Sequence, residues 1–150
     1  MKVSELFREW KFVRSELIDA VRPLTVEQLD WIPENGKNSI GDLLRHISAT
    51  EHWWFGEVVL RSGSYRDVTR EMAPDIASII KTLDYSFREY TLEVLESHNV
   101  SDFERKYQIP GEEGQVTLLW VCQHVFEHEC RHRGQIFMMM RLQGMTPPNV

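Results

Sequence analysis

The chain has 150 residues, 42% of them hydrophobic, and a formal net charge of −6. This length predicts one domain, residues 1–150, with enough apolar side chains to bury a core. The negative charge, with basic residues scattered along the chain, argues against a nucleic-acid partner, because contacts to phosphate need clustered Lys and Arg.

Neither a leader nor a membrane anchor is expected. No run approaches the ~20 apolar residues of a membrane span, and the stretch Met1–Glu9 lacks the apolar centre of a signal peptide. Cys122 and Cys130 fall about 12 Å apart on one predicted helix, too far to form a disulfide with each other. Two unpaired thiols without a leader favour the reducing cytoplasm.

Most of the chain has the apolar spacing of amphipathic helices. Four long stretches repeat apolar residues every three or four positions: 3–21, 39–61, 75–98 and 117–143. In the first, Arg14 is one of the charged residues that lie between the apolar positions. Ser39 and Thr117 are suited to cap the second and fourth helices, and Gly144 to end the fourth.

The connections between these stretches contain few strand signals. Thr25 is expected to cap a short helical turn within the loop 22–38, and the Gly-rich run 107–116 predicts a small hairpin. Four long amphipathic helices with little else predict an all-α fold, a four-helix bundle.

Three of the six histidines, His124, His128 and His132, lie four residues apart in the last predicted helix. Residues at this spacing lie above one another on a helix, so His128 and His132 form a plausible two-point clamp for a metal ion. No Asp, Glu, His or Cys follows His132, so a further ligand must come from upstream.

His46 is the leading candidate for the upstream ligand, because the second helix places it at the edge of its buried face. His52 lies about 240° around that helix from His46 and is expected to be a surface or structural residue. His128 and His132 are expected on or beside the inward row of the last helix, as metal sites in bundles usually are. The alternative is that the histidines bind no metal and are hydrogen-bonded core residues around Glu127, Glu129 and Gln135.

The string from His128 to His132 also matches the H-E-x-x-H pattern of zinc proteases, with Glu129 as the general base. The missing downstream ligand and the small size of the chain make this the weaker interpretation.

Two segments resemble the DinB/YfiT-like superfamily of metal-binding helical bundles, which is unrelated to the DNA polymerase of the same name. They are Ser39–Ile47 with the following Glu51-His52-Trp53-Trp54, and the run His128–Ile136 with its closing H-x-x-x-H-R-G-Q-I. The resemblance implies a four-helix bundle, frequently a homodimer, with zinc, nickel or a similar ion held by His46, His128 and His132. Characterised relatives include S-transferases and an isomerase that use low-molecular-weight thiols. His124 remains open as a supporting group or an alternative ligand.

Three neutral imidazoles suit zinc or nickel better than magnesium or calcium. Three protein ligands leave a coordination position open, which is the pattern of a catalytic site. We therefore expect a metal-dependent thiol transferase or hydrolase acting on an electrophilic small molecule, and a non-enzymatic dimeric metal-binding or stress-related module is the alternative. Trp53, Trp54 and Trp120 either wall a pocket or fill the core.

Overall fold

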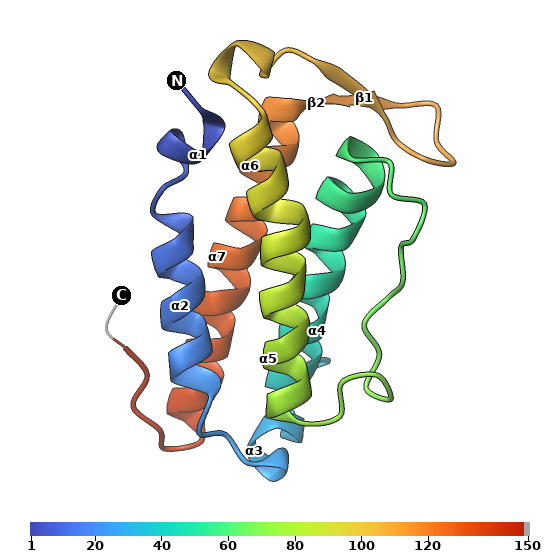
Figure 1. Cartoon of the computed structure of the whole chain (residues 1–150). Helices are drawn as coiled ribbons and strands as arrows, with labels where there is room; N and C mark the ends of the chain where they lie inside the picture. Colours follow the sequence, from blue (N-terminus) through green and yellow to red (C-terminus); the bar gives the residue numbers. More distant parts are fainter. Residues whose placement is uncertain (149–150) are drawn as a thin grey trace.

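The computed structural model describes residues 1–148, and these form an all-α bundle of four long helical rods, as expected (Figure 1). The first rod is α2. The second joins α4 to the π-helical η1, and the third joins α5 to the π-helical η2 and to α6. The last rod, α7, is the longest. Their bounds are Trp10–Val21 (α2), Ile40–Glu51 (α4), His52–Val59 (η1), Ile76–Ser86 (α5), Phe87–Leu92 (η2), Glu93–Ser97 (α6) and Leu118–Leu142 (α7).

The prediction of one helix over 3–21 is wrong, because the chain forms α1 (Val3–Leu6) and then turns before α2. Contacts to other parts of the chain explain the break. The Val3 amide donates to the carbonyl of His98, just beyond α6, and the Phe7 ring packs against Phe126. These contacts draw the first turn toward the end of the third rod, so local helix propensity does not decide its path.

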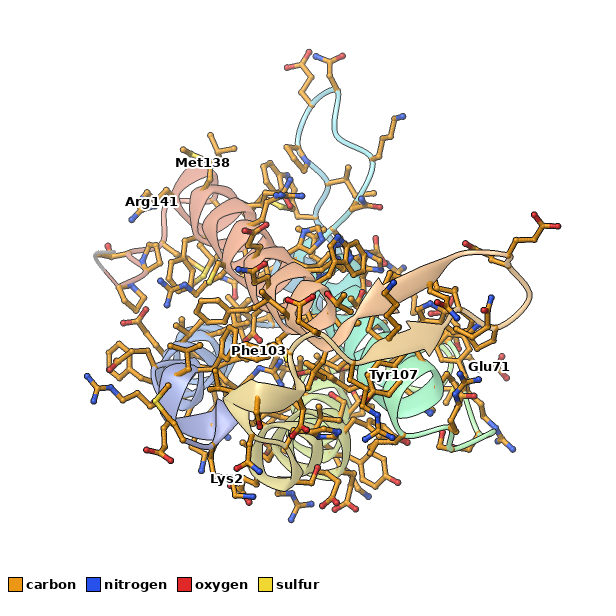
Figure 2. The ribbon with its side chains drawn as sticks, turned by 90° about the horizontal axis from the view of Figure 1, so that it is seen from above. Lys2, Glu71, Phe103, Tyr107, Met138 and Arg141 are labelled. Carbon is orange, nitrogen blue, oxygen red and sulfur yellow. The ribbon has the colours of Figure 1, made fainter. Side chains whose placement is uncertain are left out.

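Short elements lie in the connections between the rods, and the helical turn after Thr25 and the hairpin are at the predicted places. The helix α3 (Val26–Asp30) and the 3-10 turn η3 (Val100–Asp102) lie in connections, and β1 (Lys106–Gln108) pairs antiparallel with β2 (Gln115–Thr117). Thr25, Ser39 and Thr117 each accept a backbone N–H bond at the start of their helices, which confirms the predicted caps. Seen from above, the hairpin extends to one side of the helices, and Met138 and Arg141 lie on the outer side of α7 (Figure 2).

The core has two apolar clusters with a polar network between them. One cluster includes Leu17, Leu44 and Ile136, and the other includes Phe55 and Val125. No helix of the described residues is long and apolar enough to cross a membrane.

The polar network is centred on Arg14, which is only 3% exposed although the sequence placed it among the charged residues between the apolar positions. Its guanidinium donates to Glu129 through Nε (2.7 Å) and Nη2 (2.9 Å), and to Glu51 through Nη2 (2.8 Å). Its Nη1 donates to the carbonyl of Leu83 at 2.9 Å. Arg14 faces inward because two buried carboxylates replace the water that its charge would otherwise need.

Neutral donors complete the network. Trp10 Nε1 donates to Glu129 at 2.5 Å, and the hydroxyls of Ser86 and Thr91 donate to Glu51 at 2.5 and 2.7 Å. Burial would lower the pKa of Arg14, but the charges of Glu129 and Glu51 raise it. Burial raises the pKa of Glu51, and Arg14 only partly opposes this rise. The network therefore joins all four rods around one cation and two carboxylates.

Candidate metal centre

Three imidazoles converge where α4 lies beside α7. His46 comes from α4, and His128 and His132 lie one turn apart on α7. Nε2 of His128 is 2.9 Å from Nε2 of His46 and 3.0 Å from Nε2 of His132. One ligand atom from each of the three residues lies within 4.8 Å of the others, so the group could hold a metal ion. The structure thus brings together the three histidines that the sequence singled out.

The cluster lies at the edge of the buried core. His46 is exposed and the other two histidines are half-buried, whereas the neighbouring Ile47 and Glu129 are buried. His46 therefore lies at the edge of the buried face of α4, as predicted, and His128 and His132 lie beside the inward row of α7. The apolar and ionic core already fills the centre of the bundle, and the histidines occupy the outer edge of the α4–α7 contact, where an open coordination position would meet solvent.

The surroundings of His46 and His128 favour the neutral form of these two imidazoles. Burial, together with the neighbouring His132 and His46, lowers the pKa of His128 to about 3. Burial and His132 also lower the pKa of His46, while the carboxylate of Asp67 acts in the opposite direction. Neutral imidazoles keep the lone pairs that a metal ion needs.

One polar side chain orients an imidazole of the cluster through its other ring nitrogen. The amide oxygen of Gln135 lies 2.6 Å from Nδ1 of His132, which fixes the proton on Nδ1 and leaves Nε2 free to bind. Such outer contacts set the tautomer of a metal-binding histidine. The hydroxyl of Thr50 lies 3.4 Å from Nε2 of His128.

His124 continues the histidine row of α7, but it is not part of the convergent group. Its ring stacks on Trp120, with centroids 4.5 Å apart and planes 9° apart, and meets the edge of Trp54 at 5.2 Å. Its centroid is 6.3 Å from that of His128. Trp120 is not a core filler, because it is 41% exposed, whereas Trp54 packs partly buried against the core.

On the other side of the cluster lies a polar cavity of about 470 Å³. His46 and His132 line it together with Asp67 and Arg70 from the loop that follows η1. Arg70 pairs with Asp30 at 3.1 Å, which helps to hold this loop over α4. Sequence reasoning missed Asp67, because a loop residue has no periodic pattern to connect it with a distant histidine.

Two other candidates from the sequence lie outside the cluster. Glu129 is buried and bonded to Arg14 and Trp10, so it faces away from the cluster and cannot act as a base there. This geometry removes the zinc-protease interpretation. His52 stacks on Tyr90, with centroids 4.4 Å apart, and plays the structural role expected of it.

The donor set fits a transition metal. Tetrahedral zinc at about 2.0–2.1 Å from each nitrogen would separate the nitrogens by about 3.3 Å, and right-angled coordination by about 2.9 Å. The observed 2.9 and 3.0 Å are close to these separations. Three neutral nitrogens without a carboxylate do not suit magnesium or calcium.

A bundle of four helical rods with three histidines converging between α4 and α7 defines the class of this protein: a helical protein with a site that could hold a metal ion. The family model described as the DinB family matches residues 1–150, so the chain belongs to the DinB family.

Two solved structures have a similar fold. A DinB-like protein from Bacillus cereus ATCC 10987 has a TM-score of 0.76 at 18% identity, over 99% of this chain and 97% of that one. The DinB-like protein YjoA from Bacillus subtilis has a TM-score of 0.65 at 18% identity, over 98% and 95% of the two chains. At this identity the likeness establishes the fold alone. No curated protein matches the sequence.

Proposed function

We propose that this DinB-family chain is a metal-dependent enzyme that holds zinc or nickel through His46, His128 and His132 and uses an open coordination position for catalysis. The observation that carries the proposal is the convergence of three Nε2 atoms, with spacings of 2.9 and 3.0 Å to His128. No Asp, Glu or Cys of the described residues joins this group as a fourth ligand.

The reaction we propose is transfer of a low-molecular-weight thiol to an electrophile, with hydrolysis as the related alternative. A divalent ion at this position lowers the pKa of a bound thiol or water and so supplies a nucleophile at neutral pH. The chain's own contribution is orientation, because Gln135 fixes the tautomer of His132. The cavity beside His46 and His132 offers room for the electrophile.

Elemental analysis of protein expressed in metal-supplemented medium tests the site. We expect about one divalent ion per chain, because the three imidazoles form one site. Replacing His46, His128 or His132 with Ala should abolish binding, whereas His52→Ala and His124→Ala should retain it. A metal content near zero in the unmodified protein would refute the proposal.

Cobalt-substituted protein tests the reaction. A thiol that enters the open position should change the visible absorption spectrum of the cobalt form. If no small thiol changes the spectrum, transfer is ruled out, and hydrolysis remains the version to assay.

A non-enzymatic metal-binding module is the second candidate. It is favoured by the origin of the three histidines, since an ion bound to them would link α4 to α7 and stabilise the bundle. This candidate predicts a large fall in melting temperature on chelation and no turnover with any thiol or ester.

We also propose a homodimer. Met138 and Leu142 are 56% and 62% exposed on the outer side of α7, and they line a shallow groove with Pro33 and Leu43. Exposed apolar surface of this kind is typical of contact surfaces between proteins. Sedimentation equilibrium should give twice the chain mass, and a Met138→Lys, Leu142→Lys double variant should give the chain mass.

A further inference from the structure

An unusual aromatic surface adjoins the histidine cluster. Trp120 lies in the first turn of α7 and is 41% exposed. It stacks on His124 and meets Trp54, which comes from η1, at a centroid distance of 4.9 Å. We call Trp54, Trp120 and His124 the aromatic wall.

The polar atoms of the wall are free. Among residues 1–148, no side-chain hydrogen bond engages the ring nitrogens of His124 or the indole nitrogens of Trp54 and Trp120, whereas the buried indole of Trp10 donates to Glu129 at 2.5 Å. Burial and the charge of Arg131 lower the pKa of His124, so its ring is an uncharged aromatic surface. Water solvates a large, half-exposed aromatic cluster poorly, and exposed apolar surface with unused hydrogen-bond donors is typical of a binding site.

The wall is next to the point where the three imidazoles converge. His124 lies one turn before His128 on α7, about 6 Å along the axis, and the two ring centroids are 6.3 Å apart. The polar cavity with Asp67 and Arg70 lies on the side of His46 and His132. The coordination position therefore has an apolar side and a polar side.

We infer that the aromatic wall binds a flat apolar group, such as a phenyl ring, of the ligand that enters the open coordination position. This inference rests on the proposed function and names the substrate class: a thiol or electrophile with an aromatic group one or two bonds from its reactive atom. The ring packs against the exposed edges of the stacked Trp120 and His124 rings, and the polar remainder points to the cavity at Asp67.

The test compares two thiols of similar acidity, phenylmethanethiol and 2-mercaptoethanol, by titration of the cobalt-substituted protein. We expect Trp120→Ala to weaken phenylmethanethiol binding about 10-fold, the upper end of what one aromatic pair contributes. Binding of 2-mercaptoethanol should change less than twofold, and Trp120→Phe should restore most of the loss. Phe12→Ala, which removes a ring that is 63% exposed on α2, is the matched control and should change neither.

Equal losses for the two thiols, or no loss for either, would overturn the inference while leaving the metal site intact. If neither thiol alters the cobalt spectrum, the thiol chemistry fails separately, and the same variants are titrated with imidazole and 4-phenylimidazole, which need no thiol. A preference for 4-phenylimidazole that disappears in Trp120→Ala supports the wall, and its persistence refutes it. Failure of the protein to take up cobalt refutes both proposals.

Discussion

Replacement of Arg14 by Met should be among the most destabilising single substitutions in this chain. Arg14 supplies the only cation of a buried network that holds the carboxylates of Glu51 and Glu129. Met has a similar length and fills the space, so the change removes the charge and its hydrogen bonds with little change in packing. Glu129 then keeps its bond from Trp10, and Glu51 keeps those from Ser86 and Thr91.

The loss in the free energy of unfolding follows from the two buried carboxylates that no longer have a cation beside them. Removing one partner of a buried ion pair costs about 3–5 kcal/mol. Protonation limits the loss, because neutralising one glutamate at pH 7 costs about 3.7 kcal/mol from an unfolded pKa of about 4.3. For a domain of this size, a loss of 3–5 kcal/mol lowers the melting temperature by about 6–20 °C.

The pH dependence distinguishes this mechanism from a packing defect. In the variant, burial without the opposing cation raises the pKa of Glu51 further, so the folded state binds more protons than the unfolded state above pH about 4.3. Stability is then lost as the pH rises. At pH 5, neutralising one glutamate costs only about 1 kcal/mol, so the penalty of the substitution should be about 2–3 kcal/mol smaller than at pH 7.

Urea unfolding of the metal-free protein, followed by tryptophan fluorescence and circular dichroism at both pH values, measures the two differences. Arg8→Met is the matched control, since the side chain of Arg8 is 80% exposed and pairs only with Glu9 at the surface. It should cost less than about 1 kcal/mol. A loss below about 1 kcal/mol for Arg14→Met at pH 7, or the same loss at both pH values, would refute the reasoning.

Three further predictions concern the site and the thiols. Gln135→Ala should weaken metal binding at least about 10-fold in competition with a chromophoric chelator, whereas Gln123→Ala, exposed on the same helix, should not. Burial raises the pKa of Cys122 to about 12, so native protein at pH 8 should show at most one alkylated thiol by mass spectrometry, that of Cys130. Protein unfolded in urea should show two alkylated thiols. Since the pKa of His128 is lowered to about 3, stability of the metal-free protein should fall between pH 6.5 and 4, and less so in His128→Asn, measured by urea midpoints.

Periodicity and capping residues were enough to predict most of the fold. The apolar spacing located the four rods, and Ser39 and Thr117 marked the starts of the two helices that carry the histidines. The same regularity made it possible to predict that His128 and His132 share a helix face. His46 was identified because it lies at the edge of an apolar stripe, because the last helix needed a further ligand, and because the family resemblance implied the same residue.

The features that sequence reasoning missed depend on contacts between distant segments. Arg14 looks like a surface residue in its own helix, and only the carboxylates from α4 and α7 make its burial favourable. Asp67 reaches the cavity beside His46 through a loop that is held by the pairing of Arg70 with Asp30. The break before α2 likewise comes from the bond between Val3 and His98. The periodicity of apolar residues and the helix propensity depend only on residues near each other in the sequence, so they cannot predict such pairings.

The buried network and the histidine cluster use adjacent residues of the same two helices. On α4, Thr50 adjoins His128 while its neighbour Glu51 turns inward to Arg14. On α7, His128 faces the cluster while its neighbour Glu129 turns inward to the same guanidinium. The charged network therefore fixes the rotation and separation of α4 and α7 at the level where the imidazoles converge. A site held in this way is preorganised without the ion, so weakening the network should loosen metal binding even though no member of it touches the histidine nitrogens.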